Sequence, residues 1–128
     1  MLNHPQVSVV DDDESFRDSM RRLLKSLSYE VSAFASAAEF LASPDVIDTA
    51  CLVADIHMPD MTGIELYERL NETGHAIPTI LVTAYPNDGV RERMMTLGVV
   101  CCLPKPLVEA ELIHCLELAA ARNITLNG

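Results

Sequence analysis

The segment LVADIHMPDMTG, residues 52–63, joins a strand to a helix through a short loop. It begins within an apolar run, residues 51–54, that is short enough to be a fully buried strand. Asp55 stands where that run ends. Thr62 and Glu65 have the spacing of a capping box, which predicts that a helix follows the loop. Ligands in open α/β sheets bind outside the carboxyl ends of the strands, so Asp55 is a candidate for chemistry. A lone aspartate there is more often a turn or cap residue. Whether Asp55 has a chemical role therefore depends on which residues stand at the other strand ends.

The rest of the chain alternates in the same way between apolar runs and helical patterns. Strands are predicted at residues 7–10, 30–34, 51–54, 79–82 and 99–103. Helices are predicted at residues 14–27, 36–41, 63–72 and 88–97, with a last helix whose buried stripe is Leu112, Leu116 and Ala119. A turn is predicted at Pro44 and Asp45. Five strands alternating with five helices predict an α/β fold, a doubly wound parallel sheet with helices on both faces.

Length and composition limit the class of protein. The chain has 128 residues and 49% hydrophobic residues, which fits one domain, residues 1–128, with a sizeable core. Its net charge of -10 argues against direct contact of this domain with nucleic acid. We find no apolar run long enough to span a membrane and no basic segment of a signal peptide near the start, so we expect a cytoplasmic domain.

Four cysteines are present: Cys51, Cys101, Cys102 and Cys115. The first three fall in predicted buried strands and the last on a helix. Adjacent cysteines bridge only with strain, and the spacing matches no zinc pattern. We therefore expect all four to be small buried side chains without disulfides in a reducing compartment.

Several strand ends supply polar side chains to the same edge of the predicted sheet. They are Asp11, Asp12, Asp55, Thr83 and Lys105. Crowded carboxylates raise one another's pKa unless a cation lies among them, and a few oxygen ligands with room for water and phosphate are typical of Mg²⁺. A lysine and a hydroxyl suit phosphoryl oxygens. Each of these residues has an ordinary structural explanation by itself, and only their combination points to phosphoryl transfer at Asp55.

Two neighbouring features were weighed against this site. Asp13 and Glu14 are expected to be N-terminal helix residues, favoured there by the helix dipole. The first strand is followed by carboxylates rather than by the glycine pattern of dinucleotide-binding folds, so dinucleotide binding is disfavoured.

The sequence resembles the receiver domains of two-component response regulators over residues 6–122. The motifs that carry the resemblance are Val10-Asp11-Asp12, residues 55–63, Val82-Thr83-Ala84 and Lys105-Pro106, in the family's order and spacing. The resemblance implies a flavodoxin-like (βα)5 fold with strand order 2-1-3-4-5. It looks similar in particular to receivers attached to LuxR-type helix-turn-helix domains.

The resemblance also implies a mechanism. Asp55 would be the phosphoacceptor, taking a phosphoryl group from a sensor histidine kinase in a His-Asp phosphorelay. Asp11, Asp12 and Asp55, with the backbone carbonyl of His57, would hold Mg²⁺ or Mn²⁺. Lys105 would pair with the phosphoryl group, aimed by a cis bond to Pro106, and Thr83 would move toward it. Such a domain catalyses its own phosphorylation and dephosphorylation but is not a turnover enzyme.

The sequence departs from the family's pattern at the switch. An aromatic residue usually stands three positions before the lysine, where this chain has Cys102, and Pro104 should stiffen the loop. The expected switch residues are therefore Thr83, Ala84, Tyr85 and Cys102, with Tyr85 taking over part of the aromatic role.

The first predicted helix carries basic residues on its exposed side: Arg17, Arg21, Arg22 and Lys25. A solvated helix face explains them as well as a docking site does. By the resemblance, Arg17, Arg21 and Arg22 are candidates for kinase docking. Dimerisation on phosphorylation is expected through the face made by helix 88–97, strand 99–103 and the last helix.

Three further questions stay open at this point. Residues 123–128 are expected to be a frayed tail or the start of a linker, and control of transcription would need a domain outside this chain. A pseudo-receiver or stand-alone interaction module that phosphate does not switch is the alternative. A phosphatase similar to the haloacid group is disfavoured, because His57 occupies the position of that group's second aspartate and no cap domain is present.

Overall fold

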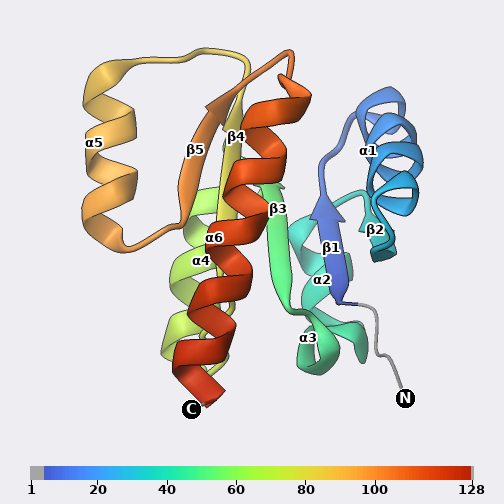
Figure 1. The fold of residues 1–128 in the computed structure, drawn as a ribbon. Helices are drawn as coiled ribbons and strands as arrows, with labels where there is room; N and C mark the ends of the chain where they lie inside the picture. Colours follow the sequence, from blue (N-terminus) through green and yellow to red (C-terminus); the bar gives the residue numbers. More distant parts are fainter. Residues whose placement is uncertain (1–4, 128) are drawn as a thin grey trace.

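The computed structural model describes the backbone of residues 5–127 and the side chains of residues 5–123. Over this range one parallel sheet runs in the order β2-β1-β3-β4-β5, as expected (Figure 1). Its strands are β1 (Gln6–Val10), β2 (Glu30–Phe34), β3 (Cys51–Asp55), β4 (Thr79–Thr83) and β5 (Cys101–Pro104). The chain steps from β1 outward to β2 and then returns past β1 to β3, so the strand order reverses between β1 and β3. Ligands of doubly wound sheets bind at this point.

Helices cover both faces of the sheet, as expected (Figure 1). They are α1 (Glu14–Ser26), α2 (Ala37–Leu41), α3 (Asp45–Asp48), α4 (Gly63–Glu72), α5 (Asp88–Leu97) and α6 (Glu109–Asn127). Alternate residues of each strand face opposite sides of the sheet. Val9, Val53 and Val82 pack with α1 and α6, whereas Ala54 and Leu81 pack with α2 to α5. The central strands are therefore apolar on both faces, which explains why their sequences are continuous rather than alternating.

Capping side chains fix where the helices begin. Asp13 accepts hydrogen bonds from the backbone of Ser15 and Phe16, so it is the N-cap of α1, in keeping with its expected role. The Thr62–Glu65 capping box is present at the start of α4. This capping box fixes the point where the loop after Asp55 joins α4.

Most element boundaries agree with the sequence-based prediction to within one residue, and three differ by more. The turn predicted at Pro44 and Asp45 is followed directly by the short helix α3, because proline is well tolerated at a helix start and Val46 is buried there. Strand β5 begins at Cys101 rather than at Val99. The backbone N–H of Val99 instead donates a hydrogen bond to the Met94 oxygen in the last turn of α5. Helix α6 continues to Asn127, beyond the frayed tail expected from residue 123, since no glycine or proline interrupts that segment.

One prediction about the cysteines is wrong. Cys101 and Cys115 form a disulfide, and Cys51 and Cys102 are the free cysteines. The sequence argument weighed only adjacent cysteines and metal spacings. The crossover from β5 to α6 returns the chain across the sheet, which brings Cα atoms 14 residues apart in sequence to within 6.1 Å.

None of the helices that the structure describes is both long enough and apolar enough to cross a bilayer.

Candidate functional site

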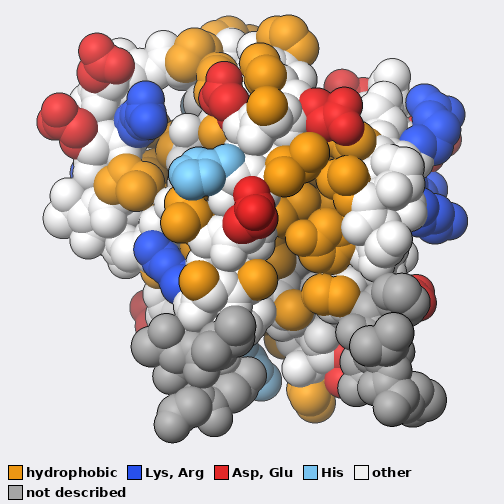
Figure 2. Space-filling model, viewed as in Figure 1, with side chains coloured by type: hydrophobic (Ala, Val, Ile, Leu, Met, Phe, Trp, Pro, Cys, Tyr) orange, Lys and Arg blue, Asp and Glu red, His pale blue; other side chains and the backbone are white. Residues whose placement is uncertain are grey.

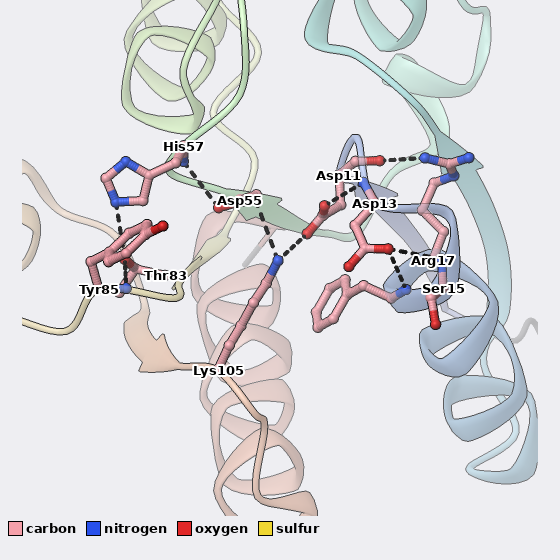
Figure 3. Close-up of polar contacts among 10 residues, drawn as sticks. Asp11, Asp13, Ser15, Arg17, Asp55, His57, Thr83, Tyr85 and Lys105 are labelled. Atoms are coloured by element: carbon pink, nitrogen blue, oxygen red, sulfur yellow. Dashed lines mark hydrogen bonds and ion pairs between the residues drawn. The ribbon is translucent and has the colours of Figure 1, made fainter.

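Two carboxylates and one ammonium group meet at the carboxyl edge of the sheet (Figure 3). Asp11 follows β1 directly and Asp55 ends β3, and these strands are neighbours with Val10 paired to Ala54. Lys105 follows β5 and reaches across the edge. Its Nζ donates to Asp11 Oδ2 at 2.7 Å and to Asp55 Oδ2 at 3.3 Å. Three residues distant in sequence are thus joined in one ion-pair network.

A third carboxylate completes an acidic cluster. Carboxylate oxygens of Asp11, Asp12 and Asp55 all lie within 4.8 Å of one another. Asp11 is fully buried and Asp55 is 7% exposed, whereas Asp12 is exposed. The cluster therefore has two oxygen donors fixed inside the protein and one at its open side, and the structure brings together the three carboxylates that the sequence singled out.

The network shifts the pKa values of Asp11 and Lys105. Burial raises the pKa of Asp11, and the nearby charge of Asp55 adds to this effect, while hydrogen bonds from Lys105 and the Asp13 backbone oppose it. Burial alone would lower the pKa of Lys105, but the hydrogen bond and charge of Asp11, together with Asp55, raise it. Lys105 therefore stays protonated at neutral pH, and its positive charge compensates the negative charge of the two carboxylates.

Helix α1 holds the site from one side. Arg17 Nη1 donates to the backbone oxygen of Asp11 at 2.7 Å, and the Asp13 N–H donates to Asp11 Oδ1 at 2.9 Å. Lys105 Nζ also lies 4.3 Å from the centroid of the Phe16 ring, a cation–π contact. This contact could not be predicted from the sequence, because no local pattern signals that a distant lysine lies over the Phe16 ring.

His57, Thr83 and Tyr85 form a second group on the other side of Asp55 (Figure 3). His57 Nε2 and Thr83 Oγ1 share a hydrogen bond of 3.1 Å, and the Tyr85 N–H donates to Thr83 Oγ1 at 2.9 Å. The His57 and Tyr85 rings meet edge to face at 5.2 Å between centroids. The His57 N–H donates to Asp55 Oδ1 at 3.0 Å. The sequence analysis assigned His57 only a carbonyl role and did not foresee this contact of its ring with Thr83.

The remaining residues singled out in the sequence lie farther from the carboxylates. Ala84 and Tyr85 are exposed in the loop after β4, and Cys102 is buried in β5. Arg21 pairs with Asp18 on the surface of α1 at 3.1 Å, and Arg22 is exposed. Arg17 is not a free surface charge, because its guanidinium is bonded to the Asp11 backbone.

Gly63 leaves room for the backbone of Asp55. A Cβ at this position would meet the Asp55 carbonyl oxygen far inside van der Waals contact and would lie 3.2 Å from Leu81 Cδ2. We expect Gly63→Ala to destabilise the fold by about 2 kcal/mol, measured by urea denaturation, because buried backbone must move. Gly74→Ala is a poor control because of its positive φ, whereas Gly89→Ala in α5 should change stability by less than about 1 kcal/mol. Equal effects of Gly63→Ala and Gly89→Ala would contradict this account.

A doubly wound sheet with buried carboxylates and a bridging lysine at its switch point defines a class of phosphate-handling α/β domains. Within that class, the chain belongs to the response regulator receiver domain family, whose model matches residues 7–117. This family membership confirms the resemblance found in the sequence. Receiver domains are signalling modules rather than turnover enzymes.

Curated relatives and solved structures agree with this assignment. The transcriptional regulatory protein TdiR of Thauera aromatica is 34% identical over 94% of this chain and 53% of its own length. FixJ of Azorhizobium caulinodans is 33% identical over 91% of this chain and 56% of its length. The chain therefore spans about half the length of these relatives. The crystal structure of FixJ-N superposes with a TM-score of 0.82 at 34% identity, covering 94% of this chain and 96% of that one. Response regulator StyR superposes with a TM-score of 0.84 at 38% identity, covering 98% and 65%.

Proposed function

We propose that this domain accepts a phosphoryl group on Asp55 and so acts as the phosphate-controlled input module of a response regulator. The observation that carries the proposal is the bridge from Lys105 Nζ to both Asp11 Oδ2 and Asp55 Oδ2. A protonated lysine beside a nearly buried carboxylate is suited to bind the oxygens of a phosphoryl group arriving at that carboxylate.

The transfer requires few chemical steps of the protein. An Asp55 carboxylate oxygen attacks phosphorus, the new O–P bond forms, and the P–N bond of a phosphohistidine donor breaks as its imidazole takes a proton. Lys105 turns its Nζ from the Asp55 carboxylate to a phosphoryl oxygen. Thr83 exchanges its hydrogen bond with His57 for one to the same group. Because Tyr85 is bonded to Thr83 through its backbone N–H, this exchange moves the loop after β4.

The acidic cluster fits a divalent cation. Octahedral Mg²⁺ holds oxygens at about 2.1 Å, so its ligands lie within about 4.2 Å of one another, and the cluster oxygens lie within 4.8 Å. We infer that Asp11, Asp12 and Asp55, with the His57 carbonyl, hold Mg²⁺ or Mn²⁺. When bound, the ion neutralises negative charge on the transferring phosphoryl group.

A substitution of Asp12 can test metal binding without disturbing the fold. Because Asp12 is exposed and Asp11 is buried, Asp12→Ala should leave the unfolding free energy within about 0.5 kcal/mol of the wild-type value without Mg²⁺. We expect it to weaken Mg²⁺ binding at least tenfold, since one of three carboxylate ligands is lost. Isothermal titration measures the affinity, and the exposed Asp18→Ala serves as control. Unchanged Mg²⁺ affinity would remove Asp12 from the metal site.

We further propose that a histidine kinase docks beside α1. Figure 2 shows Lys and Arg side chains gathered over α1, next to hydrophobic side chains between α1 and α6. Arg21, which pairs with Asp18, and Arg22 lie on the exposed side of α1, where both can contact an acidic partner surface.

Charge reversal tests this docking site. We expect Arg21→Glu with Arg22→Glu to slow phosphotransfer from the cognate kinase at least tenfold, because like charges then meet at the interface. Transfer from acetyl phosphate should not change. Arg93→Glu, an equally exposed arginine on α5, is the matched control. If both charge reversals leave kinase transfer unaltered, these arginines do not set kinase choice.

The names of two relatives support a proposal for the output of the domain. TdiR and FixJ carry names of transcriptional regulators. We propose that this cytoplasmic receiver controls transcription through a domain outside the chain, without touching nucleic acid itself. Phosphorylation would act through dimerisation on the face formed by α5, β5 and α6.

Intact mass tests the proposed function directly. After incubation with acetyl phosphate and Mg²⁺, one acid-stable and base-labile phosphate adduct is expected per chain, and EDTA should prevent it. Beryllofluoride should give a matching adduct. A folded protein that takes up neither reagent would support the pseudo-receiver alternative. Repeated turnover of a small phosphomonoester without a retained phosphate would indicate a phosphatase.

A further inference from the structure

A disulfide fastens the last strand of the sheet to the helix that follows it. Cys101 lies in β5 and Cys115 in α6, and their Cα atoms are 6.1 Å apart. We propose that this pair is a site of thiol–disulfide exchange with small-molecule thiols of the glutathione class. Exchange at this site would reversibly break the covalent link between α6 and β5.

The disulfide lies where a small thiol can reach it. A pocket of about 380 Å³ between α5, β5 and α6 is lined by both bonded cysteines. Strand β5 is the last strand of the sheet, so no further strand covers its outer edge (Figure 1). Cys101 is half-buried and Cys115 is 2% exposed. The geometry therefore makes the Cys101 sulfur the one that an incoming thiolate attacks.

The exchange proceeds in two balanced steps. A thiolate RS⁻ attacks Cys101 Sγ, an R–S–Cys101 bond forms, and Cys115 leaves as a thiolate that takes a proton. A second RS⁻ attacks the sulfur of R, which releases the Cys101 thiol and forms RSSR. Two RSH molecules are oxidised and one protein disulfide is reduced. The reverse reaction with RSSR restores the bond.

The free Cys102 also lines this pocket, but it does not compete for either partner. Neighbouring residues of a strand face opposite sides of the sheet, and Cys102 packs with the α5 side while Cys101 packs with the α6 side. Burial also raises the pKa of Cys102, more than the nearby Arg91 charge lowers it. Little Cys102 thiolate is present at neutral pH, so the bond stays between Cys101 and Cys115.

The consequence for signalling rests on the proposed function. Both β5 and α6 belong to the face through which we propose that phosphorylation drives dimerisation. In the oxidised protein α6 is covalently held to β5. In the reduced protein α6 is held by packing, mainly of Leu112, Leu116 and Ala119, and by hydrogen bonds such as those from Arg122 to the backbone of Gly98 and Val99. Reduction should therefore loosen this face and change how tightly phosphorylated chains associate.

Counting thiols tests the exchange without any reference to phosphate. The wild-type protein is equilibrated with oxidised glutathione, unfolded and labelled with a maleimide, and its intact mass is measured. Two labels are expected, for Cys51 and Cys102, and four after reduction with excess glutathione. Four labels after oxidation would overturn the proposal.

Two single variants identify the attacked sulfur. Cys115→Ser removes the resolving thiol, so oxidised glutathione should leave one stable glutathione on Cys101. Of the bonded pair, Cys101→Ser keeps only the buried Cys115, and this variant should gain no glutathione. Cys51→Ser, a buried cysteine outside the pocket, should behave as the wild type with one label fewer. Glutathione on Cys115 in Cys101→Ser, or none on Cys101 in Cys115→Ser, would contradict the assignment.

Thermal unfolding tests whether the bond holds α6. Closing a loop of this length should raise the Tm of the oxidised form by roughly 5 to 15 °C over the reduced form, and Cys115→Ser should show no such difference. Equal Tm values would overturn the fastening of α6. If Asp55 takes no phosphate while labels and Tm behave as expected, the proposed function fails and the exchange site stands.

Discussion

Replacing Asp55 with asparagine is expected to abolish the phosphate adduct completely. An amide oxygen is a far weaker nucleophile than a carboxylate oxygen, so no acyl phosphate forms. The side chain keeps its shape, and its Oδ1 can still accept the His57 N–H. Loss of phosphate uptake therefore reports on the nucleophile and not on a collapsed site. Intact mass after treatment with acetyl phosphate and Mg²⁺ measures the effect.

Asp60→Asn is the matched control for this experiment. Asp60 is an exposed aspartate in the same loop, with a φ of 68° that asparagine also tolerates. Its variant should take up phosphate like the wild type. Stability separates loss of function from loss of fold: Asp55→Asn should unfold at the same urea concentration as the wild type or a higher one, because a repulsion with Asp11 is relieved. A phosphate adduct that persists in Asp55→Asn would move the phosphoacceptor elsewhere.

The architecture was predictable because its signals are local. Each buried strand is a short apolar run, and several helices begin at a capping side chain such as Asp13 or Thr62. The positions of Asp11, Asp55 and Lys105 follow once the strands are parallel, since all their carboxyl ends lie at one edge. Predicting that Lys105 lies near both carboxylates thus required only the correct strand order.

Contacts between distant side chains were not predictable in the same way. The Cys101–Cys115 bond depends on how α6 crosses β5, which no spacing rule encodes. The hydrogen bond between His57 and Thr83 depends on a side-chain rotamer in an exposed loop. Such contacts are determined by tertiary packing, and no short sequence motif encodes them.

Lys105→Met should be the most destabilising substitution in the site. It removes the cation that bridges Asp11 and Asp55 and leaves a fully buried carboxylate beside a second one. Removing one partner of a buried ion pair costs about 3 kcal/mol or more, because the remaining charge is uncompensated. Urea denaturation without Mg²⁺ measures the loss. Lys25→Met, at an exposed lysine in the last turn of α1, should cost less than about 1 kcal/mol.

Two conditions should reduce the cost of Lys105→Met, and both follow from the same electrostatics. Mg²⁺ should stabilise the variant more than the wild type, because the carboxylates then have no competing ammonium group. Lower pH should act in the same direction. Burial raises the pKa of Asp11, and the hydrogen bond from Lys105 is the strongest influence that lowers it, so the variant's Asp11 has a still higher pKa. A carboxyl with a raised pKa binds its proton more readily in the folded state, so the difference from the wild type should shrink between about pH 7 and pH 5. A stability difference that changes with neither Mg²⁺ nor pH would show that Lys105 acts through packing alone and would remove the bridge as the basis of the proposed function.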